Sequence, residues 1–227
     1  QGVSSAASDV YKRQVGNCRY SSITVFSFHP VKIITTGEGG LATTNDARLA
    51  ERMRKFRSHG ITKEPQQFEL PSAGPWTYEQ QDLGFNYRLT DFQAALGFSQ
   101  LQRLDELVAE RNRLVERYRK RLDPLPLSLL RVPDDVYSAH HLAVITLDQP
   151  DPVLHRALFE HLRAAGIGVQ LHYSPVHLQP YYRRLGFAVG HCPHAEAYAH
   201  SAISLPLFPG LTSEEQDYVI AQLDQFL

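Results

Sequence analysis

The stretch "VFSFHPVKIITTGEGG", residues 25–40, places Lys32 between an apolar run and a patch of glycine and threonine. The chain has five lysines, and the other four lie in visibly polar stretches. The run "SITVFSF" before Lys32 is rich in β-branched and aromatic residues and predicts a strand, and "GGLATT" after it predicts a second short strand. We therefore expect Lys32 to lie between two strands, with Ser27 five residues before it.

A lysine in such a place can carry covalent chemistry. Lysine has an ordinary pKa of about 10.4, and partial burial lowers the pKa of a lysine amine toward a free base that can condense with an aldehyde. Ser27 can donate its hydroxyl to a phosphate, and the glycines let the backbone approach it closely. Taken alone, the residues allow plainer readings too: Lys32 extending to water, Ser27 satisfying a backbone group, and "GEGG" forming a turn.

Composition narrows the class of protein. The 227 residues are 43% hydrophobic and 21% charged, which is typical of an ordinary globular protein of one or two domains. A net charge of −1 and the absence of a long apolar run argue against nucleic-acid and membrane partners. Two cysteines, Cys18 and Cys192, stand in unrelated contexts, so we expect no disulfide framework and a cytoplasmic location.

Two helices, separated by a loop, are predicted after the second strand. Residues 45–60 open with helix-capping types and close on glycine, which predicts a helix. Residues 61–87 have no sustained period and are rich in aromatics, so we expect a functional loop. Thr90 and Gln93 have capping-box spacing at the start of one helix that runs to about Leu122 and links two domains.

The remainder has an α+β pattern. A proline-rich break at residues 123–127 separates it from the preceding helix. Beyond it we expect strands at 137–148, 167–173 and 202–208, and helices at 151–166 and 212–227. Residues 1–14 match no motif and are expected to be a non-native leader, although a native helix or loop is the alternative.

Three stretches together carry a resemblance to a known family. Residues 27–40, residues 84–118, and residues 168–187 followed by 202–220 resemble, in the same order, the DegT-like nucleotide-sugar aminotransferases. These belong to the fold-type I pyridoxal-phosphate enzymes, and the resemblance runs from about Val15 to the C-terminus.

The resemblance implies an α/β fold, the C-terminal part of an aspartate aminotransferase-like enzyme. It implies that residues 15–105 are a remnant of the large cofactor-binding domain and that residues 106–227 form the small α+β domain. Pyridoxal 5'-phosphate is the implied cofactor, and a homodimer with shared active sites is the implied assembly.

Within the family, the segments "SFHPVK", "TTGEGG" and "HYSPVHLQPYY" most resemble the transaminases of pseudaminic acid biosynthesis. That branch implies amination of C4 of a UDP-linked 4-keto-6-deoxy N-acetyl sugar, with glutamate as the amino donor. Relatives that deoxygenate the sugar instead have histidine at the lysine position, so Lys32 argues against them.

The resemblance assigns the cofactor residues. Lys32 is the covalent anchor of the cofactor and the general acid and base of the reaction. Ser27 is the phosphate ligand on the same chain, and Asn86 reaches the cofactor phosphate of the other subunit. His29 is near enough in sequence to reach the substrate, and a histidine packed at a strand end is the alternative.

Substrate contacts are assigned in the same way. Tyr87 and Arg88 follow the asparagine, and the forked donors of Arg88 suit a nucleotide diphosphate. Pairing of Arg88 with Asp91 is the alternative. Tyr173 and His177 match the segment of the small domain that approaches the sugar.

Other readings remain beside this one. The cluster "HCPHAEAYAH", residues 191–200, lacks a second ligand pair at usual zinc spacing, so we expect no metal site. The family has a large stretch before the lysine segment that carries further cofactor contacts, and we expect this chain alone to be weakly active or inactive. A non-catalytic binding or regulatory module that kept the fold is the alternative function.

Overall fold

The computed structural model describes residues 7–8 and 14–227 of the chain, so nearly all of the expected leader lies outside the described residues. Two units divide the chain, Gln1–Leu104 and Asp105–Leu227. Helices and strands are mixed in both units, which confirms the predicted α/β class. The assignment of residues 15–105 and 106–227 to two functional domains stays a prediction.

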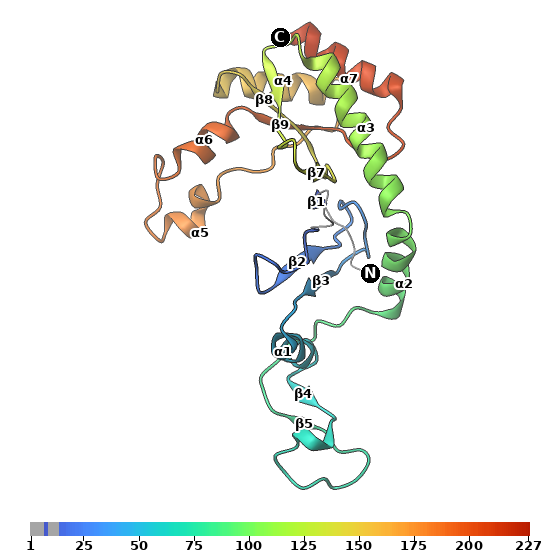
Figure 1. Ribbon diagram of the computed structural model, residues 1–227. Helices are drawn as coiled ribbons and strands as arrows, with labels where there is room; N and C mark the ends of the chain where they lie inside the picture. Colours follow the sequence, from blue (N-terminus) through green and yellow to red (C-terminus); the bar gives the residue numbers. More distant parts are fainter. Residues whose placement is uncertain (1–6, 9–13) are drawn as a thin grey trace. The chain divides into compact units, whose positions relative to one another are not determined.

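Unit 1 is built on small antiparallel strand pairs (Figure 1). In the pair β2–β3, Thr24 faces Thr43 and Ser27 faces Gly40, so the two strands expected on either side of Lys32 are confirmed. The elements of unit 1 are β1 (Ala7–Ser8), β2 (Thr24–Ser27), β3 (Gly40–Thr43), α1 (Ala47–Arg57), β4 (Ile61–Thr62), η1 (Pro65–Gln67), β5 (Glu79–Gln80) and α2 (Asp91–Leu101).

Helix α1 confirms the helix predicted at residues 45–60. The Asp46 carboxylate accepts from the backbone N–H groups of Arg48 and Leu49 at 2.8 and 3.3 Å. Such a cap satisfies orphan donors of the first turn and contributes about 1 kcal/mol. Gly60 follows the helix at φ +72, and a side chain there would overlap the carbonyl of Asp82.

The single helix predicted from Thr90 to Leu122 is wrong, because the structure has two. Helix α2 ends at Leu101, and α3 (Leu104–Leu122) begins after a turn in which Arg103 N donates to Gln100 O at 3.0 Å. No glycine or proline marks this turn, so the sequence carries no signal for it. The predicted capping box on Thr90 and Gln93 is present.

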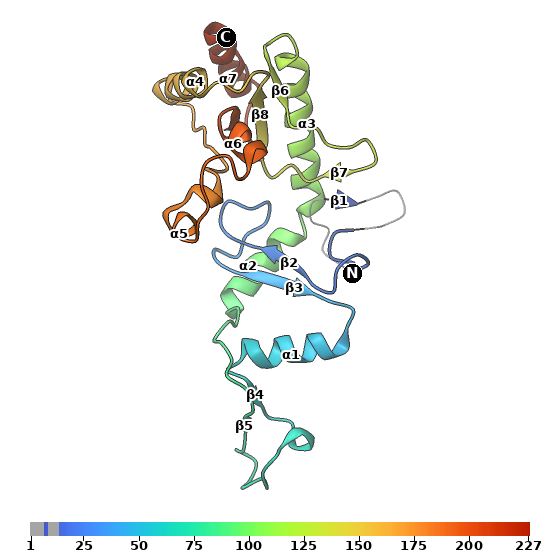
Figure 2. The same ribbon diagram turned by 90° about the vertical axis from the view of Figure 1, so that its left-hand side faces the viewer.

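Unit 2 is an α+β unit with a three-stranded antiparallel sheet in the order β6–β8–β9. Figures 1 and 2 show α3, α4 and α7 around this sheet. Its elements are α3, β6 (Leu127–Leu129), β7 (Tyr137–Ser138), β8 (Ala143–Leu147), α4 (Pro152–Ala164), η2 (Val176–Leu178), α5 (Pro180–Arg183), α6 (Pro193–Ala199), β9 (Ala202–Leu205) and α7 (Ser213–Phe226).

The core of unit 2 lies between these helices and one face of the sheet. Each fully buried aliphatic side chain contributes about 1.5–3 kcal/mol. Tyr118 is fully buried, its hydroxyl donates to Pro206 O at 3.1 Å, and burial raises its pKa to about 12. The largest buried apolar residues of this core are Leu114, Tyr118, Leu122, Ile145, Leu158, Leu162, Ile203 and Leu223. No helix in the described part of the chain has the length and apolar character needed to span a membrane.

Two predicted strands of unit 2 need correction. Residues 137–148 split into β7 and β8, because the carbonyls of His140 and His141 accept from the buried Arg111 guanidinium, each at 3.2 Å. Residues 167–173 form only one bridge, in which Gln170 and Ser204 exchange two backbone hydrogen bonds. The helices predicted at 151–166 and 212–227 are confirmed as α4 and α7.

Candidate active site

The loop that carries Lys32 is closed at its base by hydrogen bonds. Phe28 N donates to Gly39 O at 2.9 Å, which extends the β2–β3 ladder by one step. Phe28 O accepts from Thr36 N at 3.0 Å and from the Thr35 hydroxyl at 2.9 Å. The loop therefore projects from a base that the backbone holds in place.

Two glycines make this base possible. Gly39 has φ +154, and a Cβ there would overlap Thr36 Oγ1 and lie 2.8 Å from Leu89 Cδ1. A Cβ on Gly40 would lie 2.8 Å from the carbonyl oxygen of Phe26. The "GEGG" turn thus requires glycine for both conformation and close packing.

Helix α2 supports the same loop from a distant part of the sequence. The side-chain Oε1 of Gln100 accepts from Thr35 N at 3.0 Å, and the side-chain Nε2 of Gln93 donates to Glu38 O at 2.9 Å. The sequence singles out Gln93 only as a capping residue. Its second role depends on proximity in space, for which the sequence has no signal.

Lys32 and His29 lie on this loop, and Ser27 is the last residue of β2 at its base. Lys32 is half-buried, its backbone N–H donates to His29 O at 2.9 Å, and no side chain in residues 7–8 or 14–227 accepts from its amine. Ser27 is exposed, and its Oγ accepts from His29 N at 3.4 Å. His29 is exposed too, with Nε2 at 3.9 Å from a Glu38 carboxylate oxygen. The amine of Lys32 and the hydroxyl proton of Ser27 are thus uncommitted within the described structure.

Asn86 and its neighbours lie beside the end of α1. Asn86 forms a bridge with Ser58, and Tyr87 N donates to Arg57 O at 3.0 Å. The rings of Phe85 and Tyr87 stack at 4.8 Å, on one side of this extended segment. Asn86 alternates to the other side and is exposed.

A hollow of about 480 Å³ in unit 1 is lined both by residues that follow Asn86 and by residues of the lysine loop. Tyr87 and Arg88 line it together with Glu38, Gly39 and Gly40. Two predicted substrate residues and the glycine turn therefore share one concave surface of unit 1. Lys32, Ser27 and Asn86 do not line this hollow.

The two candidates of unit 2 differ in exposure. Tyr173 is 70% exposed, and its ring meets that of His172 edge-on at 4.8 Å. His177 is 8% exposed, and its Nε2 lies 2.8 Å from a carboxylate oxygen of Glu196. Glu196 lies in the segment 191–200, and no motif in the sequence marks it as a functional residue.

The histidine-rich segment of unit 2, residues 191–200, includes helix α6. His191 Nδ1 accepts from Ala188 N at 2.7 Å, and Cys192 directly precedes α6 as its N-cap residue. Across the residues that the structure describes, no group of three or more histidine, cysteine or acidic side chains is placed to hold a metal ion.

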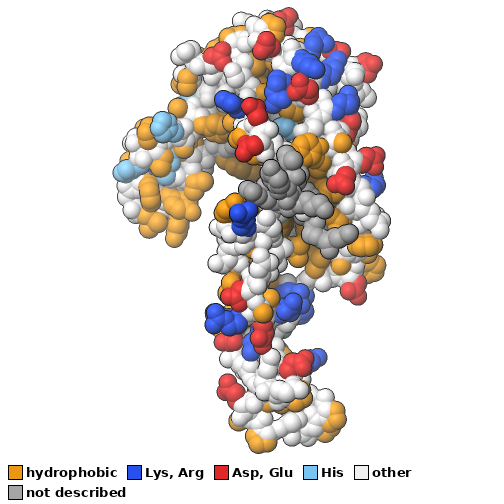
Figure 3. All heavy atoms as spheres, in the orientation of Figure 1, with side chains coloured by type: hydrophobic (Ala, Val, Ile, Leu, Met, Phe, Trp, Pro, Cys, Tyr) orange, Lys and Arg blue, Asp and Glu red, His pale blue; other side chains and the backbone are white. Residues whose placement is uncertain are grey.

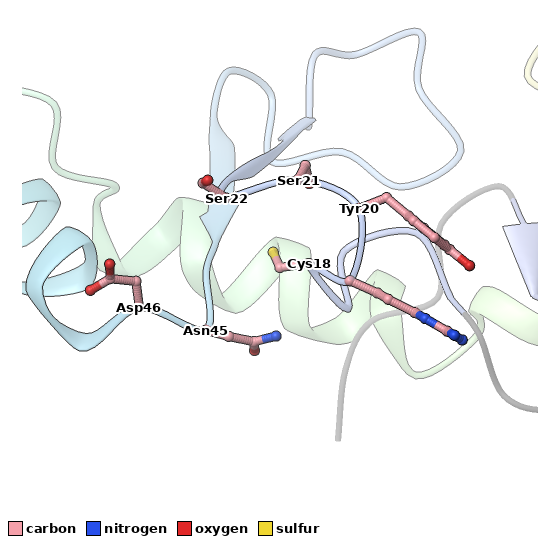
Figure 4. Close-up of a pocket in the computed structure, with 7 residues that line it drawn as sticks. Cys18, Tyr20, Ser21, Ser22, Asn45 and Asp46 are labelled. Carbon is pink, nitrogen blue, oxygen red and sulfur yellow. The ribbon is translucent and has the colours of Figure 1, made fainter.

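A second hollow of unit 1, of about 490 Å³, contains none of the candidate residues. Figure 4 shows Cys18, Tyr20, Ser21 and Ser22 from the segment before β2, and Asn45 and Asp46 before α1. The Cys18 thiol lies 3.2 Å from Thr43 O, and a hydrogen bond with the Thr43 hydroxyl lowers its pKa. This hollow is not part of the candidate site.

The residues of the lysine loop fit pyridoxal phosphate. The cofactor needs a primary amine for its aldehyde and hydrogen-bond donors for its phosphate. Lys32 and Ser27 offer both without breaking an existing side-chain contact among the described residues. Gly39 and Gly40 leave the nearby backbone free of side-chain bulk.

Comparison with known proteins identifies the family of the chain. The model of the DegT/DnrJ/EryC1/StrS aminotransferase family matches residues 2–224. The chain is 35% identical over 215 residues to the spore coat polysaccharide biosynthesis protein SpsC of Bacillus subtilis, covering 92% of this chain and 54% of SpsC.

Solved structures give the same result. A putative sugar aminotransferase, Spr1654 from Streptococcus pneumoniae, matches in its PMP form with a TM-score of 0.87 at 28% identity, covering 97% of this chain and 56% of Spr1654. Its PLP form matches as well. PseC from Helicobacter pylori, an aminotransferase involved in the biosynthesis of pseudoaminic acid, has a TM-score of 0.86 at 31% identity, covering 98% of this chain and 58% of PseC.

The chain thus spans about half the length of these relatives. The family model nevertheless covers nearly all of the chain, and the lysine loop and the glycine turn lie within the match. The chain belongs to the DegT/DnrJ/EryC1/StrS aminotransferase family.

Proposed function

We propose that this chain carries the lysine-bearing part of a pyridoxal-phosphate-dependent aminotransferase that acts on a nucleotide-linked keto sugar. The observation that supports the proposal most directly is the Lys32 amine, uncommitted among the described residues, on a loop that β2, β3 and α2 hold in place. Membership of the family supplies the reaction class.

Lys32, Ser27 and Asn86 have separate roles toward the cofactor in this proposal. When bound, pyridoxal phosphate supplies the electron sink through which an amino group passes between an amino acid and a keto sugar. Lys32 holds the cofactor through its amine and then takes and returns a proton at the reacting carbon. Ser27 donates its hydroxyl to the cofactor phosphate, and Asn86 serves the partner subunit of a homodimer in the same way.

The substrate side of the site rests on a second group of residues. Tyr87 and Arg88 line the hollow beside the glycine turn, where a guanidinium can pair with a diphosphate. His29 lies on the same loop as Lys32, near Glu38. Tyr173 and the segment up to His177 are the remaining candidate substrate contacts that the resemblance implies.

We further propose a UDP-linked 4-keto-6-deoxy N-acetyl sugar as the acceptor and glutamate as the donor, for pseudaminic acid or a related surface glycan. The likeness to PseC and to SpsC, a polysaccharide biosynthesis protein, supports this choice. Both cysteines are free, which suits the cytoplasm as the compartment.

Chemical trapping tests the function. The chain is incubated with pyridoxal phosphate, reduced with borohydride and mapped by peptide mass spectrometry. We expect the label to concentrate at Lys32 relative to Lys55, Lys63 and Lys120, because Lys55 donates to Gln81 at 2.8 Å and Lys120 pairs with Glu116 at 3.6 Å. The variant Lys32→Ala should lose the label and the visible absorbance of the complex, whereas Lys63→Ala should keep both.

An even spread of label over the lysines would contradict the proposal and favour a binding or regulatory module. Protection tests the substrate class in the same assay. We expect UDP-N-acetylglucosamine, a stable analogue of the acceptor, to reduce labelling of Lys32, and free N-acetylglucosamine to leave it unchanged.

A further inference from the structure

In unit 2, the carboxylate of Glu196 forms hydrogen bonds at both ends of the exposed loop 178–192. Glu196, in α6, lies 2.8 Å from His177 Nε2, which precedes the loop. The same carboxylate accepts from Gly190 N at 2.9 and 3.0 Å and from Cys192 N at 3.4 Å, at the other end. The side chains of His177 and Glu196 are 8% and 13% exposed, so the contact is largely shielded from water.

The loop between these ends contains helix α5 and ring contacts among its own residues, such as Tyr182 with Phe187, but none of its side chains from 179 to 191 is buried. Every residue from 179 to 191 is exposed, including Tyr181, Leu185 and Val189 at 61%, 62% and 77%. Figure 3 shows hydrophobic and histidine side chains together in the region where Figure 1 draws α5 and α6. Hydrophobic burial therefore cannot fix the position of the loop, and the polar contacts at its ends must do so.

The negative charge of Glu196 strengthens the hydrogen bonds at the ends of the loop. The hydrogen bond from His177 is the main cause that lowers the pKa of Glu196, and the amides of Gly190 and Cys192 lower it further against the opposing effect of burial. The carboxylate is thus ionised at neutral pH, and its hydrogen bonds are charge-assisted. Glu196 is the only acidic residue between Leu171 and His200, so no neighbour in the segment can replace it.

We propose that Glu196 is a positioning residue, which through His177 and the loop amides fixes the segment from Tyr173 to His177 and the loop 178–192 in the conformation that substrate meets. The role of Tyr173 in this statement rests on the proposed function. His177 then acts by holding the segment, and its ring does not need to touch the sugar.

The contact between His177 and Glu196 can affect Tyr173 because the two residues of the segment, Tyr173 and His177, are close in the chain. His177 lies in η2, only four residues after the exposed Tyr173, so movement of its ring displaces the segment before it. Without the carboxylate, a largely buried ring N–H and two loop amides lose their acceptor at once. Unsatisfied buried donors are costly, so the loop opens instead.

Trypsin nicking of the full chain measures the opening. Arg183 and Arg184 lie in the exposed loop, and cleavage there reports local unfolding. We expect Glu196→Gln to raise the rate of cleavage at these sites about tenfold, which corresponds to the loss of one charge-assisted hydrogen bond. The matched control is Glu160→Gln, whose carboxylate contacts the exposed Arg156, and it should leave the rate unchanged.

Two further measurements separate positioning from general loss of structure. The variant His177→Gln removes the other partner and should raise cleavage by a smaller factor, while the thermal transition of unit 2 persists in both variants. Long-range ¹⁵N–¹H spectra should place the ring proton of His177 on Nε2 in the wild type and on a mixture of both nitrogens in Glu196→Gln.

The outcomes distinguish this proposal from the proposed function. In Glu196→Gln, labelling of Lys32 without sugar should equal that of the wild type, whereas the UDP-N-acetylglucosamine concentration for half protection should rise about tenfold. Unchanged cleavage and unchanged protection would overturn the positioning role. Loss of Lys32 selectivity in the wild type would overturn the proposed function and leave the cleavage result to decide on the loop.

Discussion

At the scale of single residues, the site depends on backbone conformations that only glycine supports. Gly39 has φ +154 and packs against Thr36, which is 3% exposed and donates to Glu38 O at 2.7 Å. Any side chain at Gly39 must displace this threonine and open the base of the lysine loop. Gly37, at φ +78, is in the left-handed region too, but a Cβ at Gly37 would have no atom of the described residues within 4 Å.

We expect Gly39→Ala to lower the free energy of unfolding by about 1–3 kcal/mol, because it combines backbone strain with steric overlap. It should slow labelling of Lys32 by pyridoxal phosphate and borohydride as well. Gly37→Ala is the matched control: it should cost about 1–2 kcal/mol through its φ angle alone and leave the labelling unchanged. Urea denaturation and peptide mapping measure both effects, and equal labelling of the two variants would contradict the role of Gly39.

At the scale of elements, two capping boxes of the same type serve different units. Thr90 accepts from Gln93 N at 3.3 Å at the start of α2, and Thr212 accepts from Glu215 N at 3.2 Å at the start of α7. Of these two helices, α2 is the one that reaches the lysine loop, through Gln93 and Gln100. The caps should therefore matter equally for stability and unequally for the site.

We expect Thr90→Ala and Thr212→Ala each to cost about 1 kcal/mol in the free energy of unfolding, the usual value of an N-cap. Thr90→Ala alone should reduce the rate of labelling at Lys32, because it loosens the helix that holds the loop. The rate is measured by peptide mapping of both variants. A reduction of the same size in Thr212→Ala would mean that the effect follows stability and not the support of the loop.

Element prediction succeeded where the signal is local and failed where it is not. The predicted caps at Asp46 and Thr90 involve residues within three positions, and both are present. The turn between α2 and α3 interrupts an apolar pattern that continues across it, and the single bridge at Gln170 depends on Ser204, far along the chain. No glycine or proline lies in that turn, and the apolar alternation of residues 167–173 continues past Gln170, so the predicted elements ran across both places.

At the scale of the whole molecule, burial is distributed unevenly between the two units. Of the buried hydrophobic residues in the described part of the chain, only Ile34 and Leu104 precede Asp105. The others lie in unit 2, around β8, β9 and the helices that pack on them. Local stability follows buried apolar contact, so the two units should differ in stability.

Hydrogen exchange of the intact chain measures this difference. We expect backbone amides of β8, β9 and α4 to exchange with the free energy of global unfolding, and amides of β2, β3, β4 and β5 to exchange through smaller local openings. Mass spectrometry of peptic peptides resolves the two groups. Equal protection of both groups would show that the stability of unit 1 does not depend on its own buried side chains.

Local spacing and motifs carried by neighbouring residues were enough to predict the class of fold, the strands around Lys32, the main helices and the family. The candidate residues Lys32, Ser27, Asn86, Tyr87 and Arg88 came from such motifs, and their roles remain predictions. Tertiary structure alone decided that Gln93 and Gln100 hold the lysine loop, that Tyr87 and Arg88 share a hollow with the glycine turn, and that His177 pairs with Glu196. Those hydrogen-bonded contacts join residues that are 19 to 65 positions apart, and only the packed chain brings such groups within hydrogen-bonding distance.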